Sequence, residues 1–423
     1  MKRLSVLSTF TILIFLLSSC ASTVEVKKAP PSRFVEATLS KGIIKGVIAK
    51  PSEATSTFST EDPEVIAHVK FENISGKHTL RWEWVDPNGK FYYSTGHHPV
   101  RVSEGKYQKE VTAWNKMFVR GEKAADLLGD WQVKVYLDDD LLTSSNFRIE
   151  TDVEKPPQMA QKPNPKNWGL IIGIERYNNL PSVDFAERDA SIMREYFIRV
   201  LGVPDENMIF LVDSRATKST MTGYLKDYLP KNVERDTNLY LYFAGHGFPE
   251  VKGGVVQDTY LVPYDGNPRF ISETGYKIKD FYEDLNKLKI ERTFVFLDAC
   301  FSGGASRSEK MLGGTRPALI DPPTILLKSD KVISLASTKG GQASNSYPER
   351  KHGLFTYFLL GGLKGAADKD GDGWITMEEL FSYVQDNVAK VSRRKGVEQT
   401  PSVNPSLEAF KGLGDIKISR VSK

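Results

Sequence analysis

Two stretches decide the fold of this chain: Leu239-Tyr240-Leu241-Tyr242-Phe243-Ala244-Gly245-His246-Gly247 and Thr293-Phe294-Val295-Phe296-Leu297-Asp298-Ala299-Cys300-Phe301-Ser302-Gly303-Gly304. Each starts as a short run of aliphatic and aromatic residues, as buried strands do, and each ends in polar residues and glycines. Further strand-like runs lie at residues 168–174, 208–212 and 332–336, with helix-period segments between most of them. Such alternation predicts a mainly parallel sheet flanked by helices.

The ends of the two stretches carry an imidazole and a thiol. In open parallel sheets, active groups gather where the strands end at their carboxyl edge. Neighbouring strands would therefore bring Cys300 and His246 together, and the imidazole can generate the thiolate that attacks a carbonyl. We expect Gly245 and Gly247 to let the backbone turn sharply beside His246. A lone cysteine in this position is otherwise a core residue, and His352, at the apparent start of a helix, is the weaker candidate base.

Residues 167–395 resemble the caspase-like cysteine peptidases, especially bacterial relatives of the metacaspases. Four motifs carry the resemblance in order: Trp168-Gly169-Leu170-Ile171-Ile172-Gly173-Ile174 for the first strand, Glu187-Arg188-Asp189-Ala190 for the acidic motif of the first helix, Tyr242-Phe243-Ala244-Gly245-His246-Gly247 for the histidine motif, and Asp298-Ala299-Cys300-Phe301-Ser302-Gly303 for the cysteine motif. The resemblance implies a caspase-hemoglobinase-like α/β domain. It also implies a cysteine endopeptidase that uses a Cys300–His246 dyad, with the N–H groups of Gly247 and Cys300 as oxyanion hole.

The same resemblance implies a preference for a cationic side chain before the cleaved bond. Asp189 and Asp298 match the carboxylates of the metacaspase specificity pocket, which pair with Arg or Lys. Here Asp298 stands two positions before Cys300, where caspases that cleave after aspartate have a different context. The alternative is structural: Asp189 would cap a helix and Asp298 would close a turn. The polar stretch at 303–323 contains Arg307, Lys310 and Arg316, which makes self-cleavage there a hypothesis.

A second motif lies later in the chain, at residues 368–379. The run Asp368-Lys369-Asp370-Gly371-Asp372-Gly373-Trp374-Ile375-Thr376-Met377-Glu378-Glu379 fits the EF-hand calcium loop at every required position. The expected Ca²⁺ ligands are Asp368, Asp370, Asp372, the carbonyl of Trp374, Thr376 and Glu379. No second hand is visible in the sequence, and the alternative is that the acids only cap the following helix. No organic cofactor is expected.

The first twenty residues look like an export signal. Lys2 and Arg3 precede an apolar run that ends at Leu17, shorter than the roughly 20 residues that span a membrane. Leu17-Ser18-Ser19-Cys20 resembles the bacterial lipoprotein box, which implies lipidation of Cys20. We expect an exported protein, lipid-anchored in the bacterial cell envelope, and Ala21 favours the outer membrane by resemblance to enterobacterial lipoproteins. The alternative is a plain signal peptide with a chance cysteine.

The remaining chain shows a different pattern before residue 153. Apolar residues alternate with period two, as in Leu80-Arg81-Trp82-Glu83-Trp84, which predicts an immunoglobulin-like antiparallel β-sandwich with its tryptophans in the core. Its histidines lack the spacing of metal ligands, and we expect the pair His97-His98 in a solvated loop. The expected organisation is a signal peptide with lipobox at 1–20, a tether at 21–33, a β-sandwich at 34–152, a Pro-rich linker at 153–166, the caspase-like domain at 167–395 and a C-terminal extension ending in a short strand at 396–423.

The formal net charge of +4 is spread along the chain, so nucleic acid is not an expected partner. The expected function is peptide-bond cleavage by Cys300 and His246 on a peptide or protein substrate. The main alternative is a non-proteolytic envelope scaffold in which the β-sandwich binds a partner, and a calcium-responsive sensor is a third reading. The sequence does not identify a partner for the β-sandwich.

Overall fold

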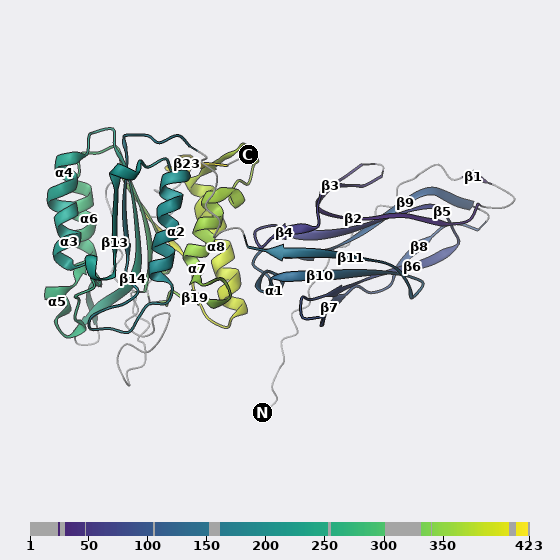
Figure 1. Ribbon diagram of the computed structural model, residues 1–423, viewed down its shortest axis with the longest axis horizontal. Coiled ribbons are helices and arrows are strands. Elements are labelled where there is room, and N and C mark those ends of the chain that lie inside the picture. Colours follow the sequence, from purple (N-terminus) through teal and green to yellow (C-terminus); the bar gives the residue numbers. More distant parts are fainter. Residues whose placement is uncertain are drawn as a thin grey trace, which may run out of the picture. The chain divides into compact units, whose positions relative to one another are not determined.

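The computed structural model describes residues 24–25, 30–46, 48–104, 106–151, 161–252, 255–300, 331–339, 341–405 and 412–421. The chain divides into two compact units, residues 1–152 and 153–423, which are described here one at a time (Figure 1). The signal peptide with Cys20, most of the expected tether, linker residues 153–160 and the stretch 303–323 lie outside the described residues.

The first unit consists of two β-sheets that enclose one hydrophobic core. One sheet has the strand order β1-β9-β5-β2-β3, and the other has the order β4-β11-β10-β6-β7, with β8 beside β6. The bounds are β1 Val24–Glu25, β2 Arg33–Ile44, β3 Lys50–Ala54, β4 Thr57–Ser59, β5 Glu64–Ser75, β6 Lys77–Val85, β7 Phe91–Ser94, β8 His98–Arg101, β9 Lys106–Phe118, β10 Gly129–Leu137 and β11 Asp140–Glu150, with the short helix α1 at Lys123–Asp126. Trp82, Trp84 and Trp131 are buried between the sheets, as the alternating pattern predicts. The finer immunoglobulin-like assignment stays a prediction.

The histidines of this unit have different surroundings. His97 is exposed, whereas His98 begins strand β8 and is half-buried, so the expected loop covers only the first of the pair. His68 is almost fully buried in β5, where its Nε2 lies 3.2 Å from the carbonyl oxygen of Ala49. Among the described residues, no His is part of a group placed to hold a metal ion.

The second unit is built on a sheet of strand order β13-β12-β14-β17-β18-β22, which confirms the mainly parallel sheet. Only β22, at the far edge, runs antiparallel to its neighbour on this path. The bounds are β12 Asn167–Gly173, β13 Met208–Val212, β14 Asn238–Lys252, β17 Arg292–Cys300, β18 Val332–Ala336 and β22 Ser402–Asn404. Because β22 comes from the segment expected to be an extension, part of that segment completes the sheet.

Helices cover both faces of this sheet (Figure 1). One face packs against α2 Ala186–Arg199, α7 Leu354–Gly361 and α8 Met377–Arg394, and the other packs against α3 Lys218–Gly223, α4 Leu229–Asn232 and α6 Ile278–Lys287. The smaller elements are α5 Ile271–Thr274, β15 Val255–Leu261, β16 Tyr276–Lys277, β19 Ser346–Tyr347, β20 His352–Gly353, β21 Trp374–Thr376 and β23 Lys417–Arg420. Among the described residues, no helix has the length and apolar character that crossing a membrane requires.

Candidate active site

The central pair of parallel strands brings the two candidate catalytic residues side by side. Strands β14 and β17 pair in register from Asn238 opposite Arg292 to His246 opposite Cys300. Parallel neighbours lie about 4.8 Å apart, and residues opposite each other project from the same face of a sheet. The exposed fraction is only 2% for His246 and 6% for Cys300, so both sit in a largely dry environment.

Cys300 is the last residue of β17, as expected, whereas His246 lies inside β14, which continues to Lys252 and so corrects the expectation that this strand ends at the histidine. Gly245 and Gly247 form no sharp turn, because β14 runs straight through them into a hairpin with β15. The lack of a side chain at Gly245 instead lets Tyr177 pack closely against the strand. A Cβ atom at this position would overlap the hydroxyl of Tyr177 and contact the ring of Phe243.

His246 is oriented by two residues of the loop that follows β12. Its Nε2 lies 2.8 Å from the carbonyl oxygen of Pro181, and its backbone N–H donates to the Tyr177 hydroxyl at 2.7 Å. The rings of Tyr177 and His246 are 4.7 Å apart, centre to centre. Because a carbonyl only accepts, Nε2 carries the hydrogen in the neutral ring, and the basic lone pair is left on Nδ1.

Cys300 contacts the loop that follows β18. The backbone N–H of Ser344 donates to Sγ at 2.7 Å, and the carbonyl oxygen of Ser344 lies 3.4 Å from the same sulfur. Ser344 is 1% exposed, so the contact is shielded from water. A backbone donor aimed at a sulfur atom favours the thiolate over the thiol.

Asp298, the first of the two pocket candidates, is 1% exposed and accepts two hydroxyl hydrogen bonds. Ser344 Oγ donates to its Oδ1 at 2.6 Å, and Thr356 Oγ1 donates to its Oδ2 at 2.6 Å. It lies within β17 and closes no turn, contrary to the structural alternative.

Asp189, the second candidate, is completely buried in α2. Its Oδ1 lies 2.6 Å from Nδ1 of His352, and its Oδ2 accepts the backbone N–H of Gly353 at 2.8 Å. Asp189 is not the N-cap residue, which is Phe185, and its two carboxylate oxygens contact His352 and Gly353. The contact between Asp189 and His352 therefore links α2 to the residues just before α7.

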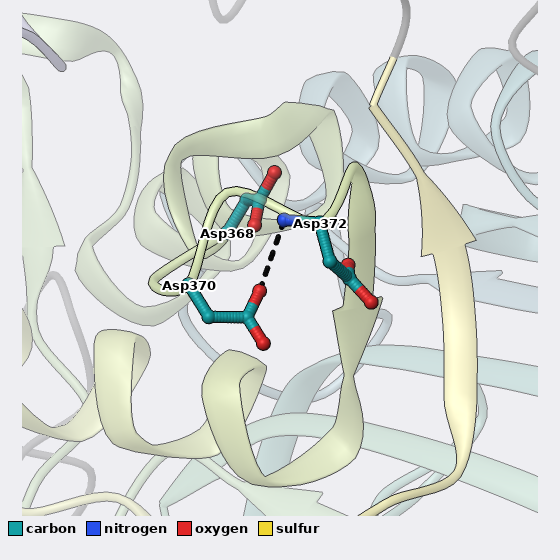
Figure 2. A group of neighbouring side chains, drawn as sticks. All are labelled: Asp368, Asp370 and Asp372. Atoms are coloured by element: carbon teal, nitrogen blue, oxygen red, sulfur yellow. Dashed lines mark hydrogen bonds between the residues drawn. The ribbon is translucent and has the colours of Figure 1, made fainter.

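The EF-hand-like loop forms a compact acidic turn. Figure 2 shows the carboxylates of Asp368, Asp370 and Asp372, which each offer an oxygen within 4.8 Å of the other two. Gly373 has the positive φ of +82° that the sharp turn of such a loop requires. Strand β21 lies within the loop, at Trp374–Thr376, and pairs antiparallel with β23.

Glu379, the expected last ligand, turns back onto the loop. Its carboxylate accepts from Thr376 N–H and Oγ1 at 2.9 and 2.8 Å and from the N–H of Lys369 at 3.0 Å. Burial by itself would raise the pKa of Glu379, but these hydrogen bonds outweigh it and hold the pKa below its ordinary value. The alternative role as a helix cap is therefore present: Thr376 and Glu379 form a capping box for α8.

The comparison with protein families decides the assignment of the second unit. A family model described as a caspase domain matches residues 166–409, more than half of the chain. The chain belongs to the caspase family. It is 23% identical over 273 residues to a probable protease from a Desulfuromonadales bacterium, covering 59% of this chain and 32% of that protein. It is 26% identical over 150 residues to metacaspase-1A of Aspergillus oryzae, covering 32% of this chain and 34% of that protein. The chain thus spans about a third of the length of these curated relatives.

Solved structures give weaker similarities. A structure of pro-sf-caspase-1 is 14% identical with a TM-score of 0.37, covering 61% of this chain and 93% of that one. An immunoglobulin-like protein from Pseudomonas aeruginosa is 13% identical with a TM-score of 0.20, covering 29% of this chain and 98% of that one.

Sequence reasoning missed four residues that surround the caspase-family pair. Tyr177 and Pro181 contact His246, whereas Ser344 contacts Cys300 and is in turn contacted by Gln399. Pro181 and Ser344 act through backbone atoms, which leave no signal in residue type. Gln399 follows α8 and could not be placed near Cys300 without the fold.

Proposed function

We propose that this caspase-family chain is a cysteine endopeptidase with Cys300 as nucleophile and His246 as general base. The observation that carries the proposal is the register of β14 and β17, which sets the two residues opposite each other in one parallel pair. The contact between His246 Nε2 and the carbonyl of Pro181 supports Nδ1 as the basic atom. A non-proteolytic envelope scaffold is not favoured by the family match.

The reaction follows from these groups. Nδ1 of His246 takes the proton of the Cys300 thiol, and Sγ attacks the peptide carbonyl carbon to form a C–S bond. The N–H groups of Gly247 and Cys300 donate to the oxyanion of the tetrahedral intermediate. The imidazolium then gives its proton to the departing amine as the C–N bond breaks. Water, deprotonated by His246, hydrolyses the thioester and releases the free thiol.

We assign Arg or Lys as the residue before the cleaved bond, with Asp189 and Asp298 as the carboxylates that select it. Both carboxylates lie on the helix α2 face of the sheet, as Cys300 does, which supports this assignment. Both are buried, so a substrate cation must displace at least one of their present partners. Self-cleavage after Arg307, Lys310 or Arg316 is part of the same proposal. Separately, we propose that lipidation of Cys20 anchors the protein in the cell envelope.

The test is covalent labelling of the full chain by peptidyl acyloxymethyl ketones that end in Arg, Lys or Asp. We expect the Arg and Lys probes to modify Cys300, with no modification in Cys300→Ala and at least 100-fold slower labelling in His246→Ala. An unlabelled wild-type chain would make the scaffold reading the better one. Preference for the Asp probe would leave the peptidase standing and overturn the pocket assignment.

We further propose that the loop at 368–379 binds Ca²⁺ through Asp368, Asp370, Asp372, Thr376, Glu379 and the carbonyl of Trp374. The clustered carboxylate oxygens and the positive φ of Gly373 support this donor set, since Ca²⁺ prefers oxygen ligands in a tight loop. Binding must draw Glu379 from its capping hydrogen bonds, so we expect modest affinity.

Trp374 provides a direct assay, because excitation of an indole sensitises a Tb³⁺ ion bound in the same loop. We expect Tb³⁺ luminescence that excess Ca²⁺ quenches and that Glu379→Gln weakens at least tenfold. The matched control is Glu378→Gln, which alters the exposed neighbour of Glu379. Equal signals from both variants would reject the loop as the site.

A further inference from the structure

The loop that follows β18, described at residues 337–339 and 341–345, contacts both Cys300 and the C-terminal part of the fold, and Ser344 makes the contact with Cys300. Of the two Ser344 groups near the sulfur, the backbone N–H is the closer, at 2.7 Å, and the carbonyl oxygen lies at 3.4 Å. The N–H donor keeps this advantage only if Ser344 is held in place. The thiolate is the reactive form of a cysteine, and a hydrogen bond to it lowers the pKa of the thiol. What holds Ser344 therefore bears on the reactivity of Cys300.

Hydrogen bonds of three side chains hold Ser344 and its neighbour Asn345 in place. Ser344 Oγ donates to Asp298 Oδ1 at 2.6 Å, which fixes the residue to β17 itself. Gln399 reaches Ser344 Oγ through Nε2 at 3.4 Å, and its Oε1 accepts the backbone N–H of Asn345 at 2.9 Å. Asn345 also donates its side-chain amide to the same oxygen at 3.0 Å.

Gln399 also reaches the other end of the loop. Its Nε2 donates to the carbonyl oxygen of Ser337 at 3.2 Å, and Ser337 Oγ donates to the carbonyl oxygen of Ala299, next to Cys300. Gln399 is 1% exposed, so one buried amide joins the start and the end of the loop. Both the donor and the acceptor of this side chain are used, and all of its contacts lie within this loop.

We infer that Gln399 is a positioning residue for the nucleophile: it holds the Ser344 N–H against Cys300 Sγ and so favours the thiolate. The inference rests on the proposed function, because it concerns the same sulfur. Gln399 touches neither the sulfur nor a substrate in this arrangement and acts through Ser344.

The experiment measures the rate at which iodoacetamide alkylates Cys300 in the full chain as a function of pH, with the modified peptide followed by mass spectrometry. We expect Gln399→Ala to move the midpoint of the profile upward by about one pH unit, equal to roughly tenfold slower alkylation below the midpoint. Ser344→Ala, which keeps the N–H but loses its tie to Asp298, should move the midpoint in the same direction. The double variant should shift it by less than the sum, because both act on one contact.

The matched control is Gln342→Ala. Gln342 joins the same two segments by accepting the backbone N–H of Thr400 at 2.8 Å, but it makes no contact with Ser344. We expect the pH midpoint of Cys300 alkylation in Gln342→Ala to equal that of the wild type. A Gln399→Ala midpoint that also stays at the wild-type value, with a reactive wild-type thiol, overturns the positioning role and leaves the proposed function intact.

Two other results are equally decisive. If the wild-type thiol is never alkylated, the nucleophile assignment fails and the positioning role fails with it. If Gln399→Ala does not fold, the Ser344→Ala profile decides: an unchanged midpoint there rejects the inference, because the side-chain tie would then have no effect on the sulfur.

Discussion

At the scale of single residues, the site depends on backbone groups as much as on side chains. The imidazole of His246 is set by the carbonyl of Pro181, and the sulfur of Cys300 by the N–H of Ser344. Such contacts tolerate many residue types at the position that supplies the backbone carbonyl or N–H group. The side chains that must be of one type are those that allow a close approach, and Gly245 is the clearest case.

We expect Gly245→Ala to lower the rate of Cys300 labelling about 100-fold and to destabilise the fold by about 1–3 kcal/mol, as overpacking of a core does. The new methyl group would overlap the Tyr177 hydroxyl, which receives the N–H of His246. In Gly245→Ala with Tyr177→Phe that hydroxyl is absent, so part of the lost stability should return. Thermal unfolding of the two single variants and the double variant measures this coupling. Additive effects would show that the hydroxyl is not the obstacle.

The sequence sufficed to predict the sheet and the placement of Cys300 beside His246, because hydrophobic runs and rare residue types mark them. The bounds of 208–212 and 332–336 coincide with β13 and β18. A cysteine in a chain that has only two, and a histidine between two glycines, also stand out. The surroundings of Asp189 and Asp298 could not be predicted. Their partners, His352 and Thr356, lie far away in sequence and meet them only after α7 packs against α2.

At the scale of elements, β23 places a cation beside the acidic loop. Lys417 Nζ lies 3.4 Å from Asp372 Oδ2 and 5.0 Å from the centre of the Trp374 ring. A fixed positive charge there opposes the entry of Ca²⁺. We expect Lys417→Met to raise the affinity for Ca²⁺ about two- to fivefold, the range of a partly exposed ion pair. Calorimetric titration at low and high salt checks this, and a gain that persists undiminished at high salt would speak against an electrostatic cause.

The buried residue His68 in strand β5 makes the stability of the first unit depend on pH. Burial lowers the pKa of His68 below its ordinary value of 6.5, an effect that the hydrogen bond to Ala49 only partly offsets. Below about pH 6.5, His68 therefore binds a proton more readily in the unfolded chain than in the folded chain. Stability is therefore complete above about pH 6.5 and falls as the pH drops below that value.

We expect His68→Gln to flatten this dependence between pH 7 and pH 5, measured as the melting temperature of the first unit. A slope remains in that variant because burial also lowers the pKa of His98. The control is His97→Gln, at an exposed position in the same unit. Identical slopes in both variants would assign the acid sensitivity to other groups.

At the scale of the whole molecule, the two units have separate hydrophobic cores. The core of the first unit runs from Leu39 to Ile149, whereas the two main cores of the second use residues from Leu170 onward, with none in common. The candidate dyad, the loop held by Gln399 and the acidic loop all belong to the second unit. The described residues of the β-sandwich thus contribute nothing to the proposed chemistry.

Separate cores predict that residues 161–423 fold and react without the sandwich. Expressed alone, this segment should be labelled at Cys300 by the Arg probe within about threefold of the full-chain rate, because every described contact of His246 and Cys300 is retained. Circular dichroism establishes that the segment is folded before labelling begins. If the folded segment is inert while the full chain reacts, the sandwich must supply something that the dyad needs, and the two units would have to be treated as one enzyme.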